Sequence, residues 1–233
     1  MKSIDVVQHV LLRSGTAWVL WVLGALSVVS LAIIIERWLF LRRRDCEPRA
    51  LAKSIRAHLI RRNFAAAAQE LGKTKAVAAA VAAAGLQLAD LGPSAVEKSM
   101  QSAVAIERGL LERWLPYLGT VGNNAPFIGL FGTVIGIIGA FNELGHGAAG
   151  QVAAAGPGGQ LASQAVMTSI AEALVATAVG IFVALPAVAA FNYFQRRIAS
   201  VLLATDALAN LVIAYVADAR ASQTDDLEER SSQ

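Results

Sequence analysis

Three long apolar stretches, separated by charged or glycine-rich segments, dominate the hydropathy pattern of this 233-residue chain. The first covers residues 16–38 and carries tryptophan near both ends, as membrane helices with interfacial anchors do. About twenty residues at about 1.5 Å each cover roughly 30 Å, the thickness of a bilayer core. The other two stretches, residues 118–141 and 166–194, contain one carboxylate, Glu172, and no basic residue. The pattern therefore predicts three transmembrane helices.

A cleaved signal peptide is the alternative interpretation of the first stretch, because residues 27–32 include several small side chains. The apolar stretch nevertheless continues through Ile33–Ile35 and then meets a cluster of arginines. These flanks favour a helix that stays in the membrane.

Composition and charge give the predicted spans a direction. Hydrophobic residues make up 56% of the chain, and the mean hydropathy is +0.54. Two basic residues precede the first span, fourteen lie from Arg37 to Arg113, none lies in residues 142–165, and four follow the third span. Because basic residues collect on the cytoplasmic side, the large loop and the C-terminus are expected there. The same bias accounts for the pI of about 9.3 without nucleic-acid binding.

The large loop is expected to be helical. Leu51, Ile55 and Leu59 recur at helical spacing, and the alanine-rich stretch over residues 64–84 favours one regular helix. Ser94–Glu97, which follows a Gly-Pro pair, has the pattern of a capping box that starts a further helix. An apolar stripe leads from this helix directly towards the second span.

The predicted fold class is therefore an all-α integral membrane protein with three transmembrane helices and long helices that extend into the cytoplasm. Its expected segments are an N-terminal periplasmic segment (1–15), transmembrane helix 1 (16–38), a cytoplasmic helical loop (39–117), transmembrane helix 2 (118–141), a periplasmic loop (142–165), transmembrane helix 3 (166–194), a cytoplasmic helical extension (195–218) and a disordered tail (219–233).

Candidate chemistry is sparse outside the spans. Gly72–Thr74 matches the end of a phosphate-binding P-loop, but Ala67 stands where that motif needs glycine, and no strand is expected before it. The three histidines are scattered, and Cys46 is the single cysteine, so we expect no metal site, no cofactor and no disulfide within the chain. No nucleophile and base are paired as catalysis would need, and we expect no enzyme activity.

Polar side chains inside the spans are the remaining candidates for function. A charge at the centre of a membrane helix costs about 2.5–3.5 kcal/mol, so Glu172 is expected to face a pore, a partner or a bundle interior. The alternative is that Glu172 lies near the outer interface and reaches water. Thr133 and Thr177 either line the same path or bond to their own helix backbone. Glu172 and Thr177 are about 140° apart around an ideal helix, so both reach one pore only through tilt or the length of the glutamate side chain.

Small residues recur at three- and four-residue steps along the second and third spans. Gly129, Gly132 and Gly136 lie on the second span and Gly180 on the third, and such stripes let two helices approach closely. Helix packing is a sufficient explanation for them. Because three helices alone cannot satisfy both stripes, we expect a homo-oligomer.

Two motif segments carry a resemblance to a known family. Residues 125–134, APFIGLFGTV, and residues 170–180, IAEALVATAVG, are followed by LPAV at 185–188 and by Asn192. They resemble the two signature segments of the MotA/TolQ/ExbB proton-channel family, and specifically its ExbB/TolQ branch. The resemblance covers the second and third spans closely, and the three-span layout agrees with it.

The resemblance implies a subunit of an ion-driven motor. Five copies would surround two transmembrane helices of an ExbD/TolR-like partner dimer, whose membrane aspartate takes up and releases protons. Thr133 and Thr177 would line the pore near that aspartate, and Glu172 would lie towards its outer mouth. Pro186 and the four glycines would serve helix packing.

The resemblance also implies a place and a task. The location would be the bacterial inner membrane, with a periplasmic N-terminus and a cytoplasmic C-terminus. The subunit would contact membrane lipid, and a TonB/TolA-like energy transducer would be a further partner. Proton-motive force would drive outer-membrane transport, envelope maintenance or gliding. One charge that crosses about 100 mV releases roughly 2.3 kcal/mol, so several protons suffice to move a helix.

Two hypotheses from other classes compete with the motor. A passive membrane scaffold would use the polar residues only to pack helices and would conduct no ions. A solute transporter is disfavoured, because three spans contain no inverted repeat.

Overall fold

The structure is a computed structural model that describes residues 16–44, 48–150 and 157–231. These residues form helices and turns, and no strand occurs among them. The predicted all-α class is therefore confirmed. Three helical stretches are long and apolar enough to cross a membrane, and they lie within Ala17–Ile60, Leu115–Asn142 and Val166–Ser222.

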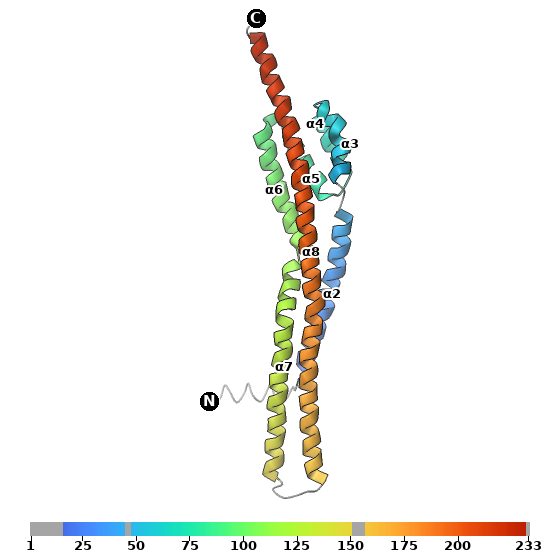
Figure 1. Ribbon diagram of the computed structural model, residues 1–233, viewed down its shortest axis with the longest axis vertical. Helices are drawn as coiled ribbons and strands as arrows, with labels where there is room; N and C mark the ends of the chain where they lie inside the picture. Colours follow the sequence, from blue (N-terminus) through green and yellow to red (C-terminus); the bar gives the residue numbers. More distant parts are fainter. Residues whose placement is uncertain (1–15, 45–47, 151–156, 232–233) are drawn as a thin grey trace. The chain divides into compact units, whose positions relative to one another are not determined.

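Seven α-helices and one 3₁₀ helix are described (Figure 1). They are α2 (Ala17–Arg44), α3 (Pro48–Ile60), α4 (Phe64–Leu71), α5 (Val77–Leu86), η1 (Ala89–Leu91), α6 (Pro93–Glu112), α7 (Leu115–Gly150) and α8 (Pro157–Ser231). The chain divides into two compact units. The first unit comprises Met1–Ile35 and Trp114–Asn192, and the second comprises Glu36–Arg113 and Tyr193–Gln233.

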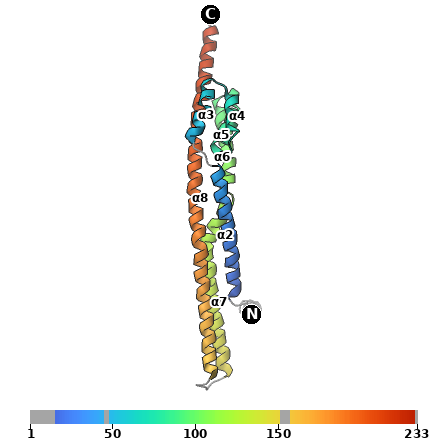
Figure 2. The same cartoon turned by 90° about the vertical axis from the view of Figure 1, so that its right-hand side faces the viewer.

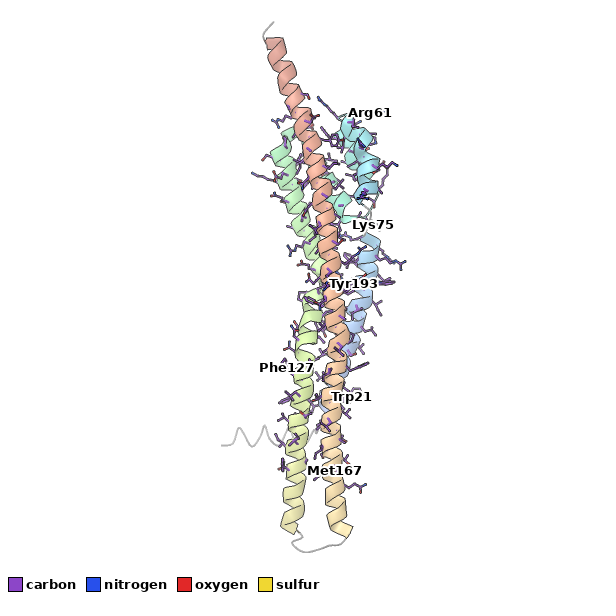
Figure 3. All side chains as sticks on the ribbon, viewed as in Figure 1. Trp21, Arg61, Lys75, Phe127, Met167 and Tyr193 are labelled. Carbon is purple, nitrogen blue, oxygen red and sulfur yellow. The ribbon has the colours of Figure 1, made fainter. Side chains whose placement is uncertain are left out.

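The first unit consists of parts of α2, α7 and α8. Helices α7 and α8 lie side by side along this unit in both views (Figures 1 and 2). Its buried apolar residues come from all three helices: Val19, Leu23, Val121, Ala125, Ile135, Val183, Ala184 and Ala187. Large apolar side chains also point outward, among them Trp21, Phe127 and Met167 (Figure 3). An apolar exterior is what lipid contact requires.

The second unit has its own hydrophobic core. Helix α3 buries Leu51, Ile55 and Leu59, the three positions that the helical spacing singled out. Helix α4 packs on α3, α5 on α4 and α6 on α5, while Leu208 and Val212 of α8 complete the core. Burial of one face of each helix stabilises this unit, at about 25 cal/mol for each Å² of apolar surface removed from water.

Two predicted helices differ from those observed. The alanine-rich stretch 64–84 is not one helix, because Gly72 ends α4 and the Thr74 hydroxyl then accepts a hydrogen bond from the Ala76 amide at 3.4 Å. Gly72–Thr74 is thus a turn between helices, where Lys73 forms an exposed ion pair with Glu70. The hydrogen bond from Lys73 and the positive charge of Lys73 hold the pKa of Glu70 below its ordinary value.

The predicted capping box at Ser94 does not start α6. Gly92, with φ of 101°, is the N-cap of α6, and Pro93 occupies the first turn, where its missing amide costs nothing. The apolar stripe of α6 does not run straight into the second span either. Trp114 has φ of 67° and separates α6 from α7.

Helices extend further than predicted at two places. Helix α7 continues to Gly150 and α8 begins at Pro157, so much of the predicted 142–165 loop is helical. Helix α8 also includes residues 219–231, which we expected to be disordered. No glycine or proline follows Pro186 to interrupt it, and an Arg220 side-chain nitrogen donates to the Leu91 carbonyl at 2.9 Å. The predicted N-terminal segment 1–15 and Cys46 lie outside the described residues.

Helix α2 is tied to the end of α6 inside the second unit by two arginines. Arg37 is 3% exposed, and its Nη1 donates to the Leu110 carbonyl at 2.9 Å, while its Nε and Nη2 donate to the Glu36 carboxylate at 2.5 and 2.6 Å. Arg44 pairs with Glu107 of α6. Cations at the C-terminal end of a helix also satisfy carbonyls that have no partner within the helix.

Arg62 gives a test of the backbone at the end of α3. Its φ is 56°, a left-handed conformation that favours glycine, and the Asn63 amide donates to the His58 carbonyl as in a helix C-terminal cap. We expect Arg62→Gly to raise the free energy of unfolding by about 0.5–1 kcal/mol, measured by pulse proteolysis of the full chain in urea. The matched control is Arg61→Gly, which removes the same charge at ordinary φ and should destabilise the protein. Equal effects of the two substitutions would contradict this account.

Candidate functional site

Helices α7 and α8 approach most closely where two glycines face each other. A Cβ added to Gly129 would lie 2.7 Å from the Ala176 carbonyl oxygen and 3.0 Å from the Thr177 Cα. A Cβ added to Gly180 would lie 2.6 Å from the Ala125 carbonyl oxygen. These distances leave no room for a side chain on either residue, so the two backbones are in direct contact.

The contact extends towards the start of α2. A Cβ at Gly132 would meet the Ala176 Cβ at 2.7 Å and a Val19 methyl at 3.2 Å. A Cβ at Gly136 would lie 3.2 Å from both the Ser169 carbonyl oxygen and the Thr16 methyl. All four predicted packing glycines therefore lie in one crossing of three helices within one chain.

This crossing changes the argument for an oligomer. The stripes were expected to pack against a neighbouring chain, but the glycines of α7 and α8 contact small residues of the same chain. The premise that three helices of one chain cannot satisfy both stripes is therefore wrong. The small residues of α7 and α8 pack against each other within one chain. Pro186, the fifth predicted packing residue, is exposed within α8 rather than buried in the crossing.

Thr177 carries a polar atom that the crossing leaves without a partner. Its hydroxyl is buried and forms no hydrogen bond with any described residue. Other threonines of the same helix bond to the carbonyl four residues earlier, as Thr168 does at 2.9 Å and Thr205 at 2.8 Å. Since a buried unsatisfied hydroxyl costs about 1–3 kcal/mol, Thr177 calls for an explanation beyond packing.

Thr133 is different. Its half-buried side chain donates from the hydroxyl to the Leu130 carbonyl of its own helix at 2.6 Å. This is the structural alternative that the sequence left open for both threonines. It applies to Thr133 and does not apply to Thr177.

Glu172 is exposed on α8, and its carboxylate accepts a hydrogen bond from the Thr16 hydroxyl at 3.3 Å. Thr16 is 4% exposed and precedes the first turn of α2. Beside Glu172 lies an open groove of about 420 Å³, whose lining is otherwise mostly apolar and includes Leu20, Met167 and Val175. Sequence patterns could not reveal that Thr16 contacts Glu172, because 156 residues separate them.

No lysine or arginine accompanies this carboxylate in the part of the first unit that the structure describes. Residues 16–35, 114–150 and 157–192, the described part of that unit, contain no lysine or arginine. Among the described residues, the Thr16 hydroxyl is the hydrogen-bond partner of this carboxylate. Carboxylates in such surroundings mark ion pathways more often than structural contacts.

The three predicted pathway residues do not gather into one site. Glu172 is exposed, the Thr177 hydroxyl is buried without bonding to a described residue, and the Thr133 hydroxyl bonds to its own helix backbone. Among the described residues, no hydrogen bond joins any two of the three.

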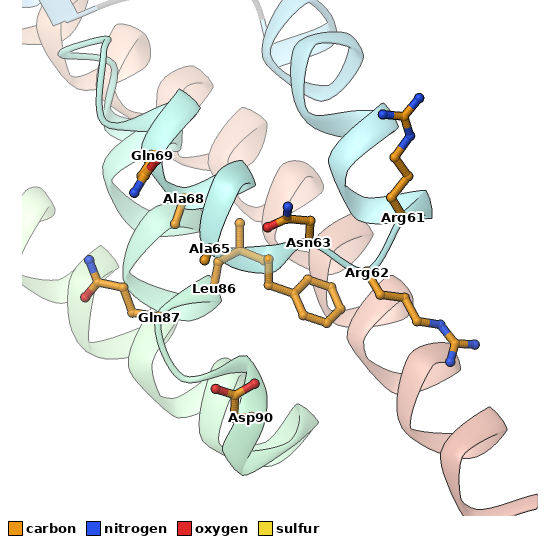
Figure 4. Close-up of a pocket in the computed structure, with 10 residues that line it drawn as sticks. Arg61, Arg62, Asn63, Ala65, Ala68, Gln69, Leu86, Gln87 and Asp90 are labelled. Atoms are coloured by element: carbon orange, nitrogen blue, oxygen red, sulfur yellow. The ribbon is translucent and has the colours of Figure 1, made fainter. Parts of the chain in front are cut away.

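A larger hollow of about 680 Å³ lies in the second unit (Figure 4). Arg61, Arg62 and Asn63 line one side, and Gln87 and Asp90 line another. Every charged or amide side chain that lines it is exposed, so none is held in a fixed, desolvated position. We assign this hollow no role.

Comparisons with known proteins place these features in a family. A model of the MotA/TolQ/ExbB proton channel family matches residues 73–207, more than half of the chain. The chain belongs to the MotA/TolQ/ExbB proton channel family. The match contains α7, the four packing glycines and all three pathway candidates, so the resemblance predicted from the two motif segments is confirmed.

Individual relatives come from the ExbB/TolQ branch. The chain is 43% identical over 102 residues to the Tol-Pal system protein TolQ of Pseudomonas aeruginosa, and these cover 44% of the chain and 39% of that protein. It is 41% identical over 116 residues to the biopolymer transport protein ExbB of Xanthomonas campestris pv. campestris, covering 49% and 41% respectively. For ExbB of Neisseria gonorrhoeae the identity is 44% over 93 residues, with 40% and 37% covered. The similarity thus spans about two fifths of each relative's length.

The crossing predicts opposite outcomes for two glycines of α7. Gly129→Ala would place a methyl group against a carbonyl oxygen, so we expect a loss of about 1–3 kcal/mol of stability from overpacking. Gly139→Ala is the matched control, because a Cβ there meets nothing within 4 Å. It should be neutral or stabilising by up to about 1 kcal/mol. Thermal unfolding of both variants in one detergent measures the difference, and equal stability would refute the close crossing.

Proposed function

We propose that this chain is an ExbB/TolQ-like subunit of an inner-membrane motor. With an ExbD/TolR-like partner it would form a proton channel that converts proton-motive force into mechanical work. The observation that carries the proposal is the pair of polar groups at the α7–α8 crossing and beside it. Thr177 holds a buried hydroxyl that bonds to no described residue, and Glu172 is a carboxylate with no lysine or arginine among the described residues of its unit.

The unpartnered hydroxyl supports a role in which Thr177 meets a group from outside the chain. A hydroxyl both donates and accepts, so it suits water or a carboxylic acid whose protonation changes. The membrane acid of an ExbD/TolR-like partner has this chemistry. Packing alone would favour valine at this position, because valine has the same shape and leaves no polar atom buried.

Glu172 supports a wet path at one side of the crossing. It is exposed at the edge of an open groove, and the Thr16 hydroxyl holds its carboxylate. Ionisable side chains in spans usually face water-filled cavities or partners. We infer that Glu172 lies at the outer mouth of the pore and keeps that mouth hydrated.

Assembly follows from where these groups lie. The described residues of one chain do not join Thr133, Glu172 and Thr177 by hydrogen bonds, and a pore shared by several copies would let all three face it. We propose a homo-pentamer, as the resemblance implies, around a dimer of the single-span partner. A TonB/TolA-like transducer would take up the motion, and the system served would be outer-membrane transport, envelope maintenance or gliding.

Orientation rests on the basic residues. We propose that the fourteen basic residues from Arg37 to Arg113 keep the large loop in the cytoplasm, with the N-terminus and the 142–165 segment in the periplasm. Membrane lipid then contacts the outward apolar side chains of the first unit.

The alternative to a proton channel is a passive scaffold without conduction. The hydrogen bond of Thr133 to its own helix is the observation that favours the scaffold.

Thr177→Val separates the two hypotheses. It removes an unsatisfied hydroxyl, so we expect stability to rise by about 1 kcal/mol. If the hydroxyl serves protons, flux should fall about tenfold or more, because a hydrogen bond to an ionisable group is lost. Proton uptake by proteoliposomes that contain the chain and its ExbD/TolR-like partner measures the flux. Glu172→Gln asks in the same assay whether the charge itself is needed.

Thr205→Val is the matched control for Thr177. Thr205 is also buried on α8, but its hydroxyl already bonds to the Val201 carbonyl, and it lies in the second unit. We expect its flux to equal that of the unmodified chain. If Thr177→Val and Glu172→Gln assemble with the partner and conduct fully, the pore assignment is wrong and the scaffold is the better hypothesis.

A further inference from the structure

A small pocket in the second unit lies between α2 and α8. Trp38, Leu41 and Arg42 of α2 line it together with Tyr193, Phe194 and Arg197 of α8. Leu41 and Phe194 are 6% and 2% exposed and form an apolar floor. Trp38 and Tyr193 are 46% and 55% exposed, so the pocket is open at an aromatic rim (Figure 3 labels Tyr193).

The two helices contribute the same pair of residue types at the same spacing. Trp38 and Arg42 are four residues apart on α2, and Tyr193 and Arg197 are four residues apart on α8. Four residues make about one helical turn, or roughly 6 Å along the axis. In both helices the aromatic residue follows a long apolar stretch and the arginine comes one turn later. Aromatic side chains favour the level of lipid headgroups, and arginine side chains reach just beyond it.

The pocket concentrates positive charge. Both arginines are exposed, and none of the six described residues that line the pocket is acidic. The Arg42 guanidinium carbon lies 5.2 Å from the centre of the Trp38 ring, a cation–π contact that orients this side chain over the rim. Two guanidinium groups from different helices can hold one phosphate through several charge-assisted hydrogen bonds.

The size of the pocket fits a headgroup and not a whole metabolite. Its volume is about 200 Å³. Sites for drug-sized molecules usually hold about 300–1,000 Å³. A phosphate with its glycerol would fit, while attached acyl chains would lie along the apolar surfaces of α2 and α8 outside the pocket.

We propose that this pocket binds the phosphate headgroup of an anionic phospholipid, with Arg42 and Arg197 as its ligands and Trp38 and Tyr193 at the rim. Bound there, the lipid would bridge α2 and α8 at the end of their apolar stretches. This inference depends on the membrane spans and does not depend on proton conduction. It therefore survives or fails separately from the proposed function.

Each pocket arginine has a neighbour that serves as its control. Arg43 adjoins Arg42 and Arg196 adjoins Arg197, and both are exposed but do not line the pocket. The double variants Arg42→Gln/Arg197→Gln and Arg43→Gln/Arg196→Gln remove the same charge from the same two helices. General attraction of lipid to basic residues is therefore equal in the two variants, and only the pocket differs.

The experiment is native mass spectrometry of the full chain, delipidated in detergent and titrated with phosphatidylglycerol or phosphatidylcholine. We expect the unmodified chain and the Arg43/Arg196 variant to retain one phosphatidylglycerol for each protomer and to prefer it over phosphatidylcholine. The Arg42/Arg197 variant should bind phosphatidylglycerol about tenfold or more weakly, because charge-assisted bonds are lost. Circular dichroism checks that all three chains are equally helical.

Other outcomes overturn the proposal. Equal weakening in both double variants would show general electrostatic attraction without a site. Equal retention of the two lipids by the unmodified chain would show that the headgroup charge is not recognised. Displacement of the lipid by millimolar inorganic phosphate would show an anion site that does not require the lipid.

Discussion

The backbones of α7 and α8 touch at Gly129 and Gly180, where neither position has room for a Cβ atom. A side chain on either glycine would push the helices apart and would open the packing of Gly132 against Ala176 and Val19 as well. In a membrane no hydrophobic effect drives helices together, so close van der Waals contact and the lipid it releases must stabilise the bundle. The position of every other group in the first unit depends on this contact.

The crossing also determines which polar groups are left over. The Thr177 Cα lies at the close approach to Gly129, and the Thr177 hydroxyl is buried without bonding to any described residue. The same packing brings the Thr16 methyl beside Gly136 and the Thr16 hydroxyl to the Glu172 carboxylate. A family of proton channels has reason to tolerate such costs, since strain and unsatisfied groups persist where function uses them.

Local composition was enough to predict part of this. Span positions and helical class depend on apolar length, and the glycine stripes depend on spacing, so both can be derived from the sequence. The break at Gly72, the left-handed Trp114 and the helical residues 219–231 could not be predicted, because neighbouring elements decide them. Distant contacts were equally hidden, as the burial of Arg37 against Leu110 illustrates. The stripes misled us about oligomerisation for this reason, since spacing does not reveal which helix a stripe meets.

The most direct test of the crossing is a disulfide within one chain. A Cβ at Gly132 would lie 3.7 Å from the Val19 Cβ, close to the roughly 3.8 Å of disulfides. We would combine Val19→Cys and Gly132→Cys with Ala176→Gly, which makes room for the new side chain, and with Cys46→Ser. After oxidation, mass spectrometry under denaturing conditions should find both thiols lost at the mass of a single chain. Cross-linked dimers, or thiols that stay free, would contradict the account.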